Sequence, residues 1–214
     1  MASKVLLSSD TGAMLVEVSF REHADLIDAV VAQAAPEFEI EPRIVVYGKE
    51  CRQPRDVQFR SDVSKGYFYS HQVMASKPLT AEMKRLLAVV NAEFGARYNG
   101  ILINRYKDGT KTVGSHSDSE SGLNATAGVV AISHGATRNF RIRDAKTNGI
   151  VGNYPARHHM ALQMKGPFQA HFKHEIPQEK RVLGERVSLT FREHDPAAEG
   201  RLRVTRRTTP DVAT

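Results

Sequence analysis

The chain has 214 residues, 41% of them apolar, which is enough to bury one well-packed core. Its single cysteine, Cys51, excludes a disulfide framework and favours an intracellular place, in the cytoplasm or the nucleus. No apolar run approaches the ~20 residues of a membrane span, and no secretory signal opens the chain, so we expect no membrane contact. A net charge of +6 and a pI of about 9.5 favour a polyanionic partner without identifying it.

The first 42 residues predict an N-terminal extension with one helix. Residues 1–13 are polar and serine-rich, as in a poorly ordered terminus, and residues 14–20 alternate weakly, as in a strand. From residue 23 to residue 35 the apolar side chains fall on one helical stripe, which Pro36 ends.

Residues 43–75 combine basic and aromatic side chains. Residues 43–47 are rich in β-branched side chains and predict a strand that Gly48 closes. Residues 49–65 predict a loop without regular structure. From residue 43 to residue 65 there are six Lys/Arg against three Asp/Glu, so this loop is either solvated or faces phosphates.

Three consecutive aromatic residues follow in the segment Gly66–Ser70. Strand alternation places Tyr67 and Tyr69 on one face and Phe68 on the other. Taken alone, this pattern favours Phe68 in the core and two half-exposed tyrosines.

The remaining chain predicts one helix and many short strands. Residues 76–94 have an apolar helical stripe that Gly95 terminates. Turn signals then separate six short strands, at residues 101–106, 127–133, 138–143, 158–164, 169–174 and 186–193. Many strands and few helices indicate an α+β, mainly β fold of the sandwich or barrel kind. Residues 195–214 are polar and arginine-rich, which predicts a disordered basic tail.

Two of these strands carry polar residues on one face. In the strand at 101–106, alternation groups Leu102, Asn104 and Tyr106. In the strand at 186–192 it separates a polar face from an apolar one: Arg186, Ser188, Thr190 and Arg192 against Val187, Leu189 and Phe191. Because buried unpaired charge is costly, the two arginines need water or an anion, and a dicarboxylate matches their guanidinium forks.

Three residues form a candidate metal site. His116 and Asp118 stand two positions apart and share one face of an extended segment, and His174 follows further along the chain. Two imidazoles and one carboxylate on one side of a metal leave three positions open, as in the facial triad of non-haem Fe(II) oxygenases. A His-x-Asp pair alone is common by chance, so the interpretation depends on its surroundings.

Other histidines compete for this role. On an extended strand His171 points away from the face of His174. His158 and His159 open a predicted strand and His134 lies in a predicted turn, so all three are interpreted as structural.

Taken together, Asn-x-Tyr, His-x-Asp, the distal His174 and Arg-x5-Arg resemble the AlkB family of Fe(II)/2-oxoglutarate dioxygenases, in particular its eukaryotic-type DNA-repair members. The likeness covers residues 43–194, implying one dioxygenase domain with a double-stranded β-helix (jelly roll) and flanking N-terminal helices. It implies Fe(II), 2-oxoglutarate and O2 as cofactors, with His116, Asp118 and His174 as metal ligands. It assigns the 2-oxoglutarate pocket to Asn104, Tyr106, Arg186, Thr190 and Arg192.

The resemblance also assigns residues 43–75 to a nucleotide-recognition lid. The segment Val46–Lys49, which includes Gly48, resembles a finger hairpin that enters the base stack, with Tyr47 as its wedge; a core strand tyrosine is the alternative. For Tyr67 and Tyr69 it favours a lid that stacks on an extracted base.

The resemblance adds two substrate-binding residues directly after the metal-binding carboxylate. Ser119 and Glu120 follow Asp118, and Glu120 shares its alternating face, from which it could accept a hydrogen bond from an exocyclic amino group. A solvated loop glutamate is the alternative.

The activity implied is oxidative demethylation of N1-methyladenine, N3-methylcytosine and etheno adducts in DNA, with succinate, CO2 and an aldehyde as products. We expect a monomer. The alternatives are an RNA base demethylase and a nucleic-acid-binding module without turnover. Between Phe140 and His158 the chain lacks the longer basic insertion of duplex-preferring members, and four residues replace it in part: Arg141, Arg143, Lys146 and Arg157.

Overall fold

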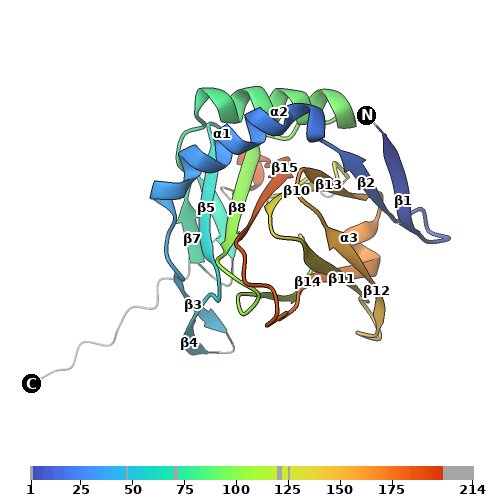
Figure 1. The fold of residues 1–214 in the computed structure, drawn as a ribbon. Helices are drawn as coiled ribbons and strands as arrows, with labels where there is room; N and C mark the ends of the chain where they lie inside the picture. Colours follow the sequence, from blue (N-terminus) through green and yellow to red (C-terminus); the bar gives the residue numbers. More distant parts are fainter. Residues whose placement is uncertain (1, 47, 70–71, 120–121, 125, 200–214) are drawn as a thin grey trace, which may run out of the picture.

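Two β-sheets pack face to face in the computed structural model, and two helices cover one of them (Figure 1). The structure describes residues 2–46, 48–69, 72–119, 122–124 and 126–199. The large sheet has the strand order β1-β2-β13-β10-β15-β8-β5, and the small sheet has the order β12-β11-β14-β9. This is the mainly β, double-stranded β-helix (jelly-roll) architecture, so the predicted fold class is confirmed.

The strands have the following bounds. The large sheet contains β1 (Ser3–Ser8), β2 (Met14–Ser19), β13 (Met160–Lys165), β10 (Val129–Gly135), β15 (Arg186–Arg192), β8 (Gly100–Tyr106) and β5 (Asp56–Ser61). The small sheet contains β12 (Ile150–Ala156), β11 (Arg138–Asp144), β14 (Phe172–Ile176) and β9 (Val113–His116). Two further hairpins are β3 (Arg43–Val46) with β4 (Lys49–Arg52), and β6 (Gly66–Tyr69) with β7 (Gln72–Ala75).

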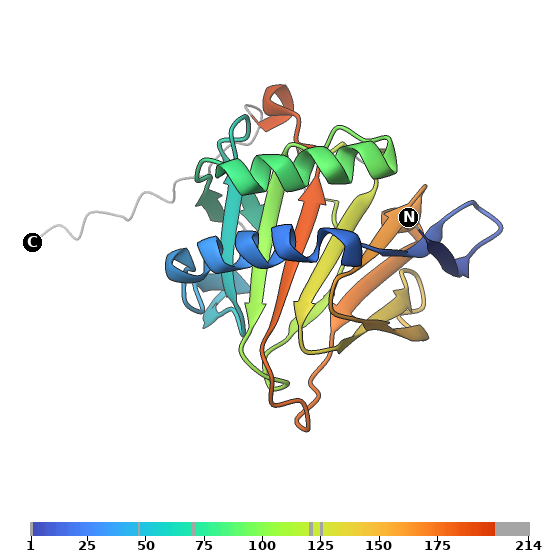
Figure 2. The ribbon, with the colours of Figure 1, turned by 45° about the horizontal axis from the view of Figure 1, so that its top comes forward.

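Helices α1 (Ala24–Ala34) and α2 (Ala81–Phe94) lie side by side across the outer face of the large sheet (Figure 2). Their apolar stripes, such as Ile27 and Leu86, form one core with Ile103 and Leu189 of that face. Short 3-10 turns flank α1 at Arg21–His23 and Ala35–Glu37. No helix of the described residues is long and apolar enough to cross a membrane.

A second core fills the space between the two sheets. Leu162 and Met164 of the large sheet meet Phe140 and Ile142 of the small one, and Phe168 from the short helix α3 (Phe168–His171) closes it. The polar faces of β8 and β15 border this core, so the fold places buried polar residues between the sheets.

Several predictions of local structure are wrong. Residues 3–8 form the edge strand β1 instead of a poorly ordered terminus, because Leu6 and Leu7 pack against the inner core while the backbone pairs with β2. The predicted strand at 169–174 begins as helix α3 after Pro167 and becomes strand β14 only at Phe172. Within the predicted tail, Pro196–Glu199 form the helix α4, and residues 200–214 lie outside the described residues.

The largest correction concerns residues 49–65. Asp56–Ser61 form β5, and all six residues are buried, because the β6–β7 hairpin and the outer helices cover the strand. Its charges are neutralised in place: Asp56 lies 2.8 Å from the Nη2 of Arg105, and Arg60 lies 2.8 Å from Glu37. Residues Asp56–Ser61 are therefore neither a solvated loop nor a phosphate-facing surface.

Candidate metal centre and cosubstrate pocket

Neighbouring strands of the small sheet bring His116, Asp118 and His174 together. His116 ends β9 and pairs in register with His174 of β14, while Asp118 follows two residues after β9. The Nε2 atoms of His116 and His174 lie 3.7 and 3.8 Å from the two carboxylate oxygens of Asp118. The spacing in sequence thus produces one compact donor set, which could hold a metal ion.

Neighbouring groups hold the three side chains in place. The Nδ1 of His116 lies 2.8 Å from the carbonyl oxygen of Gly114, to which it can donate, so that the lone pair of Nε2 faces the cluster. Phe140 stacks on His174 with ring centroids 5.1 Å apart. Arg192 donates from Nη2 to Asp118 Oδ1 at 2.6 Å, which fixes the carboxylate.

The protonation states suit a metal ion. Burial on its own would raise the pKa of Asp118, but Arg192 and the two imidazoles outweigh it and hold that pKa below its ordinary value. Burial, aided by His116, lowers the pKa of His174 to about 3, and burial also lowers the pKa of His116. Two neutral imidazoles and a carboxylate are ligands that Fe(II) accepts. Asp118 Oδ2 has no hydrogen-bond partner among the described residues, so this buried oxygen can take a metal.

A pocket extends from the histidines between the sheets. Its lining includes the inner faces of β8 and β15, as alternation predicts: Leu102, Asn104, Tyr106, Arg186, Ser188, Thr190 and Arg192. The opposite faces of the same strands lie in the outer core under the helices. Of the described residues, three arginines and no carboxylate are among those that line the pocket, which suits an anion.

Arg186 lies inside this pocket and is only 2% exposed. Its Nη2 donates to Ser133 Oγ at 2.9 Å, and its guanidinium carbon lies 5.4 Å from the ring centroid of Tyr106. Burial lowers the pKa of Arg186, yet guanidinium stays charged in proteins. Its Nε and Nη1 have no hydrogen-bond partner within the described part of the chain, so the site fits a ligand carboxylate.

Arg55 is a pocket residue that the sequence does not reveal. It is 5% exposed and donates from Nε to Asn104 Oδ1 at 2.9 Å, and both line the pocket. In the sequence it follows Pro54 within a polar basic segment, which indicates a loop. Only the burial of the adjacent strand β5 places it beside Asn104.

The structure describes some of the residues that the sequence predicts to bind substrate. Gly48, with φ +76°, lies in the two-residue turn of the β3–β4 hairpin, and Lys49 is exposed at the start of β4. Ser119 is exposed beside Asp118. Tyr47 and Glu120 lie outside the described residues.

Of the two tyrosines predicted to form the lid, only Tyr67 has a side chain that the structure describes. Tyr67 is 4% exposed, lines the pocket and lies 5.1 Å from the guanidinium of Arg192, so its interpretation as half-exposed is wrong. Tyr69 belongs to strand β6, but its side chain lies outside what the structure describes.

The competing histidines have other places. His171 ends helix α3 and is not in the His116–Asp118–His174 cluster. His134 belongs to strand β10 and not to a turn, because β10 continues to Gly135. His158 and His159 precede β13 and lie beside His134, with ring centroids 4.9 and 5.9 Å from it.

Comparisons with known proteins identify the family of this chain. The model of the 2OG-Fe(II) oxygenase superfamily matches residues 15–192. The DNA oxidative demethylase ALKBH2 of Homo sapiens is 34% identical over 157 residues, 70% of this chain and 60% of that relative. The alpha-ketoglutarate-dependent dioxygenase alkB homolog 3 of Rattus norvegicus is 32% identical over 143 residues, 63% of this chain and 48% of that relative.

A solved structure of OsALKBH1 shares the fold, with a TM-score of 0.60 at 15% identity over 84% of this chain and 97% of that one. The chain spans about three fifths of the length of the ALKBH2 relative from Homo sapiens. These relatives confirm the resemblance to AlkB proteins, and the superfamily implies Fe(II), 2-oxoglutarate and O2 as cofactors. Because the family model covers most of its length, the chain belongs to the 2OG-Fe(II) oxygenase superfamily.

Proposed function

We propose that this protein oxidatively demethylates N-alkylated bases in nucleic acid, with DNA as the preferred substrate. The observation that carries the proposal is the His116–Asp118–His174 donor set beside a pocket that contains the buried Arg186. The relatives named as DNA oxidative demethylases support the substrate class. The proposal includes a monomeric enzyme in the cytoplasm or the nucleus.

Each side chain has a physical task in this proposal. His116, Asp118 and His174 hold Fe(II), which supplies the oxidation of the N-alkyl carbon when 2-oxoglutarate and O2 are present. Arg186 pairs with the distal carboxylate of 2-oxoglutarate, and Asn104, Tyr106 and Thr190 complete that pocket. Arg192 holds Asp118 and contributes positive charge beside the cosubstrate.

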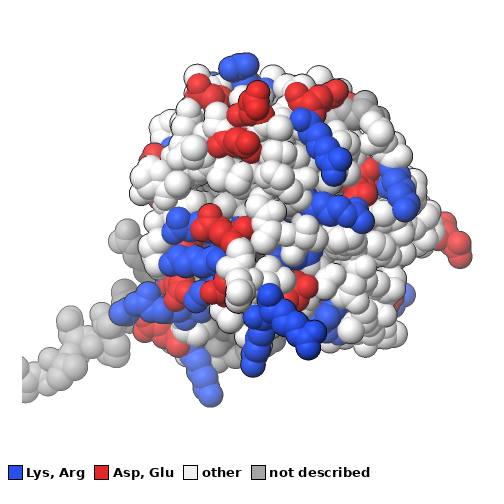
Figure 3. Space-filling view, viewed as in Figure 1, with Lys and Arg blue, Asp and Glu red and all other residues white. Residues whose placement is uncertain are grey.

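The exposed surface offers a place for nucleic acid. In Figure 3, Lys and Arg side chains project from the lower edge of the molecule, where the β3–β4 hairpin lies, among a smaller number of acidic ones. Lys49 and Arg52 of this hairpin are exposed, as phosphate contacts require, whereas the exposed Arg43 is paired with Glu50 at 2.8 Å. We propose that Gly48 and Lys49 approach the strand there, with Tyr47 as the wedge, and that Tyr67, Tyr69, Ser119 and Glu120 contact the base.

The arginines that could replace the missing insertion are engaged elsewhere. Arg141 and Arg143 both bind Glu175, at 3.2 and 3.1 Å, and Arg157 binds Glu17 at 2.6 Å. Two carboxylates thus offset part of the charge of these three arginines, which weakens this basic surface and favours single strands over duplex as the substrate.

The decisive experiment treats methylated single-stranded DNA, duplex DNA and RNA in parallel with Fe(II) and 2-oxoglutarate. Mass spectrometry of the bases and succinate release are measured together. We expect base repair with matched succinate, fastest on single-stranded DNA. Faster repair of RNA would favour the RNA demethylase, and tight binding without succinate would favour a binding module without turnover.

A further inference from the structure

A second cluster of imidazoles and a carboxylate lies on the outer face of the large sheet. It consists of Asp28 from α1, His134 from β10, and His158 and His159 from the segment before β13. Each residue offers one ligand atom, and these atoms lie within 4.8 Å of one another. The proposed function uses none of the four.

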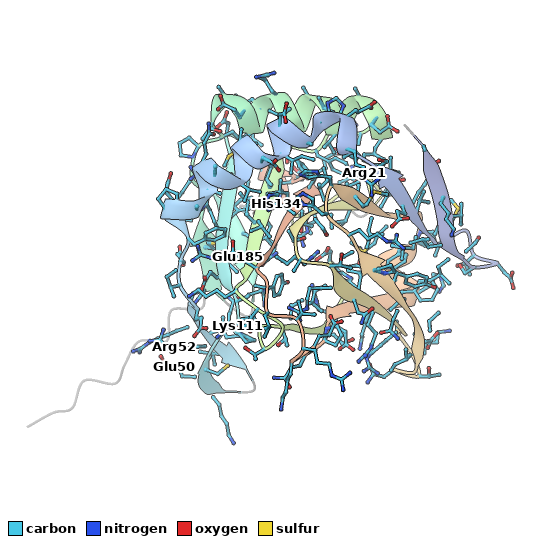
Figure 4. The ribbon with its side chains drawn as sticks, viewed as in Figure 1. Arg21, Glu50, Arg52, Lys111, His134 and Glu185 are labelled. Atoms are coloured by element: carbon cyan, nitrogen blue, oxygen red, sulfur yellow. The ribbon has the colours of Figure 1, made fainter. Side chains whose placement is uncertain are left out.

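Strand alternation separates this cluster from the iron site. Ala131 lines the cosubstrate pocket, and Ser133 accepts a hydrogen bond from Arg186 there. Ile132 packs in the outer core instead, and His134 continues that outer face beneath α1 (Figure 4). The second cluster therefore lies on the opposite face of β10 from the cosubstrate pocket.

The donor atoms converge on one oxygen. Asp28 Oδ1 lies 2.7 Å from His159 Nε2 and 3.3 Å from His134 Nε2. Ligand atoms about 2.0–2.1 Å from a tetrahedral zinc ion lie roughly 3.3 Å apart. The His134 separation equals this value, and the His159 separation of 2.7 Å is that of a hydrogen bond, which has to open to admit an ion. Small shifts would thus bring all three atoms into one coordination sphere.

The backbone holds His159 in this position. It has a left-handed φ of 56°, its N–H donates to the carbonyl of Ser133 at 2.7 Å, and its carbonyl accepts from Phe20 at 2.9 Å. A non-glycine residue with positive φ is uncommon, and such strain is often associated with a functional constraint.

His158 has a different role from the other two histidines. Its Nδ1 accepts the N–H of Gly135 at 3.0 Å, so in the neutral ring the proton is on Nε2 and no lone pair faces an ion. Its ring centroid lies 3.5 Å from that of His159 with the planes tilted by 31°, so it orients that ring by direct contact.

We propose that Asp28, His134 and His159 bind a divalent transition-metal ion of the zinc class, with water as the fourth ligand. Imidazole nitrogen and carboxylate oxygen are the donors that zinc accepts. The ion would tie helix α1 to strand β10 and to the segment before β13.

The test measures zinc by equilibrium dialysis on the untagged full chain. The Asp118→Ala/His174→Ala background removes the iron site, so one bound zinc ion is expected to remain. Adding His134→Ala should weaken this binding roughly tenfold or more, and Asp28→Asn, at a half-exposed position, should do the same. His171→Ala is the matched control and should retain the ion.

Two outcomes would overturn the assignment. If the Asp118→Ala/His174→Ala variant binds no zinc although its circular dichroism is native, the second cluster is only a hydrogen-bonded contact. Retention of zinc after both His134→Ala and Asp28→Asn would place the ion elsewhere. His158→Ala should weaken zinc binding less than His134→Ala, and the reverse order would make His158 a ligand.

Discussion

Two clusters of similar donors lie on the two sides of the large sheet, in different surroundings. On the inner side, where the small sheet packs, Asp118 and His174 are 3% and 6% exposed, and His174 lines a pocket that contains three arginines. On the outer face the Asp28 side chain is 51% exposed and the His134 side chain 28%. Imidazole and carboxylate alone therefore do not define a reaction centre. Burial and the adjacent cations give the inner cluster a site for an anionic cosubstrate, whereas the outer one can hold only an ion.

Strand β15 shows the same division along its length. Arg186 and Thr190 face the pocket, whereas Val187, Leu189 and Phe191 pack under the helices. We expect inner-face substitutions to alter turnover and outer-face substitutions to alter stability. The predictions below test this separation.

The largest effect is expected at the inner cluster. Asp118→Ala should abolish succinate release, because the metal loses the carboxylate of the His116–Asp118–His174 cluster while Arg192 loses its carboxylate partner. His116→Ala and His174→Ala should each do the same, and so should removal of metal with a chelator. Turnover assays with added Fe(II) measure this. His171→Ala is the control, and loss of iron binding in that variant but not in His174→Ala would reverse the ligand assignment.

On the outer face, Leu189→Ala should lower the free energy of unfolding by about 2–5 kcal/mol, since it opens a cavity under the helices. Leu189 is fully buried there. Urea denaturation measures the loss, and the KM for 2-oxoglutarate should stay unchanged in the folded variant. A large rise in that KM would show that the two faces are coupled.

Arg186→Ala should weaken 2-oxoglutarate binding by about 1.5–3 kcal/mol, the contribution of a hydrogen bond to a charged group. The KM for 2-oxoglutarate measures the effect. Arg186→Lys should fall between wild type and Arg186→Ala, because lysine keeps the charge without the fork. Arg97→Ala removes an exposed arginine beyond α2 and should leave this KM unchanged. An unchanged KM for 2-oxoglutarate in Arg186→Ala would show that Arg186 does not bind the cosubstrate.

The need to extract a base from duplex distinguishes the proposed roles of Tyr47 and Tyr69. Tyr47→Ala should slow repair of methylated duplex far more than repair of a single strand, because unstacking a base costs a few kcal/mol mainly in duplex. Tyr69→Ala should slow both by a similar factor, since stacking contributes ~1–3 kcal/mol on either substrate. Rates on matched substrates at one salt concentration decide this. An equal loss of repair rate on duplex and on single strand for Tyr47→Ala would favour the alternative, a tyrosine of a core strand.

Much of the inner site could be predicted because alternation is a local rule. The faces of β8 and β15 and the shared face of His116 and Asp118 follow from period two, whereas the choice of His174 came from the family resemblance. The same rule could not place Arg55, because its position depends on which elements cover β5.

Contacts between residues far apart in the sequence explain why the other features were not predicted. The second cluster joins Asp28 of a helix to His134 and His159, which lie more than a hundred residues along the chain. No motif spacing links such positions, and His134 also seemed to lie in a turn because Gly135 follows it. Burial of β5 was equally hidden, since its charges are paired with residues from other elements.

The smallest expected effect is at the start of α2. Thr80 caps this helix by accepting the N–H of Met83 at 3.2 Å, so Thr80→Ala should cost about 1 kcal/mol of stability. Because α2 lies only on the outer face, the KM for 2-oxoglutarate should not change, and Thr80→Ser should restore the cap. Urea denaturation of the three proteins measures the cap, and cosubstrate titration measures the pocket. A weakened pocket in Thr80→Ala would mean that the outer layer, and not the sheet alone, sets the geometry of the inner face.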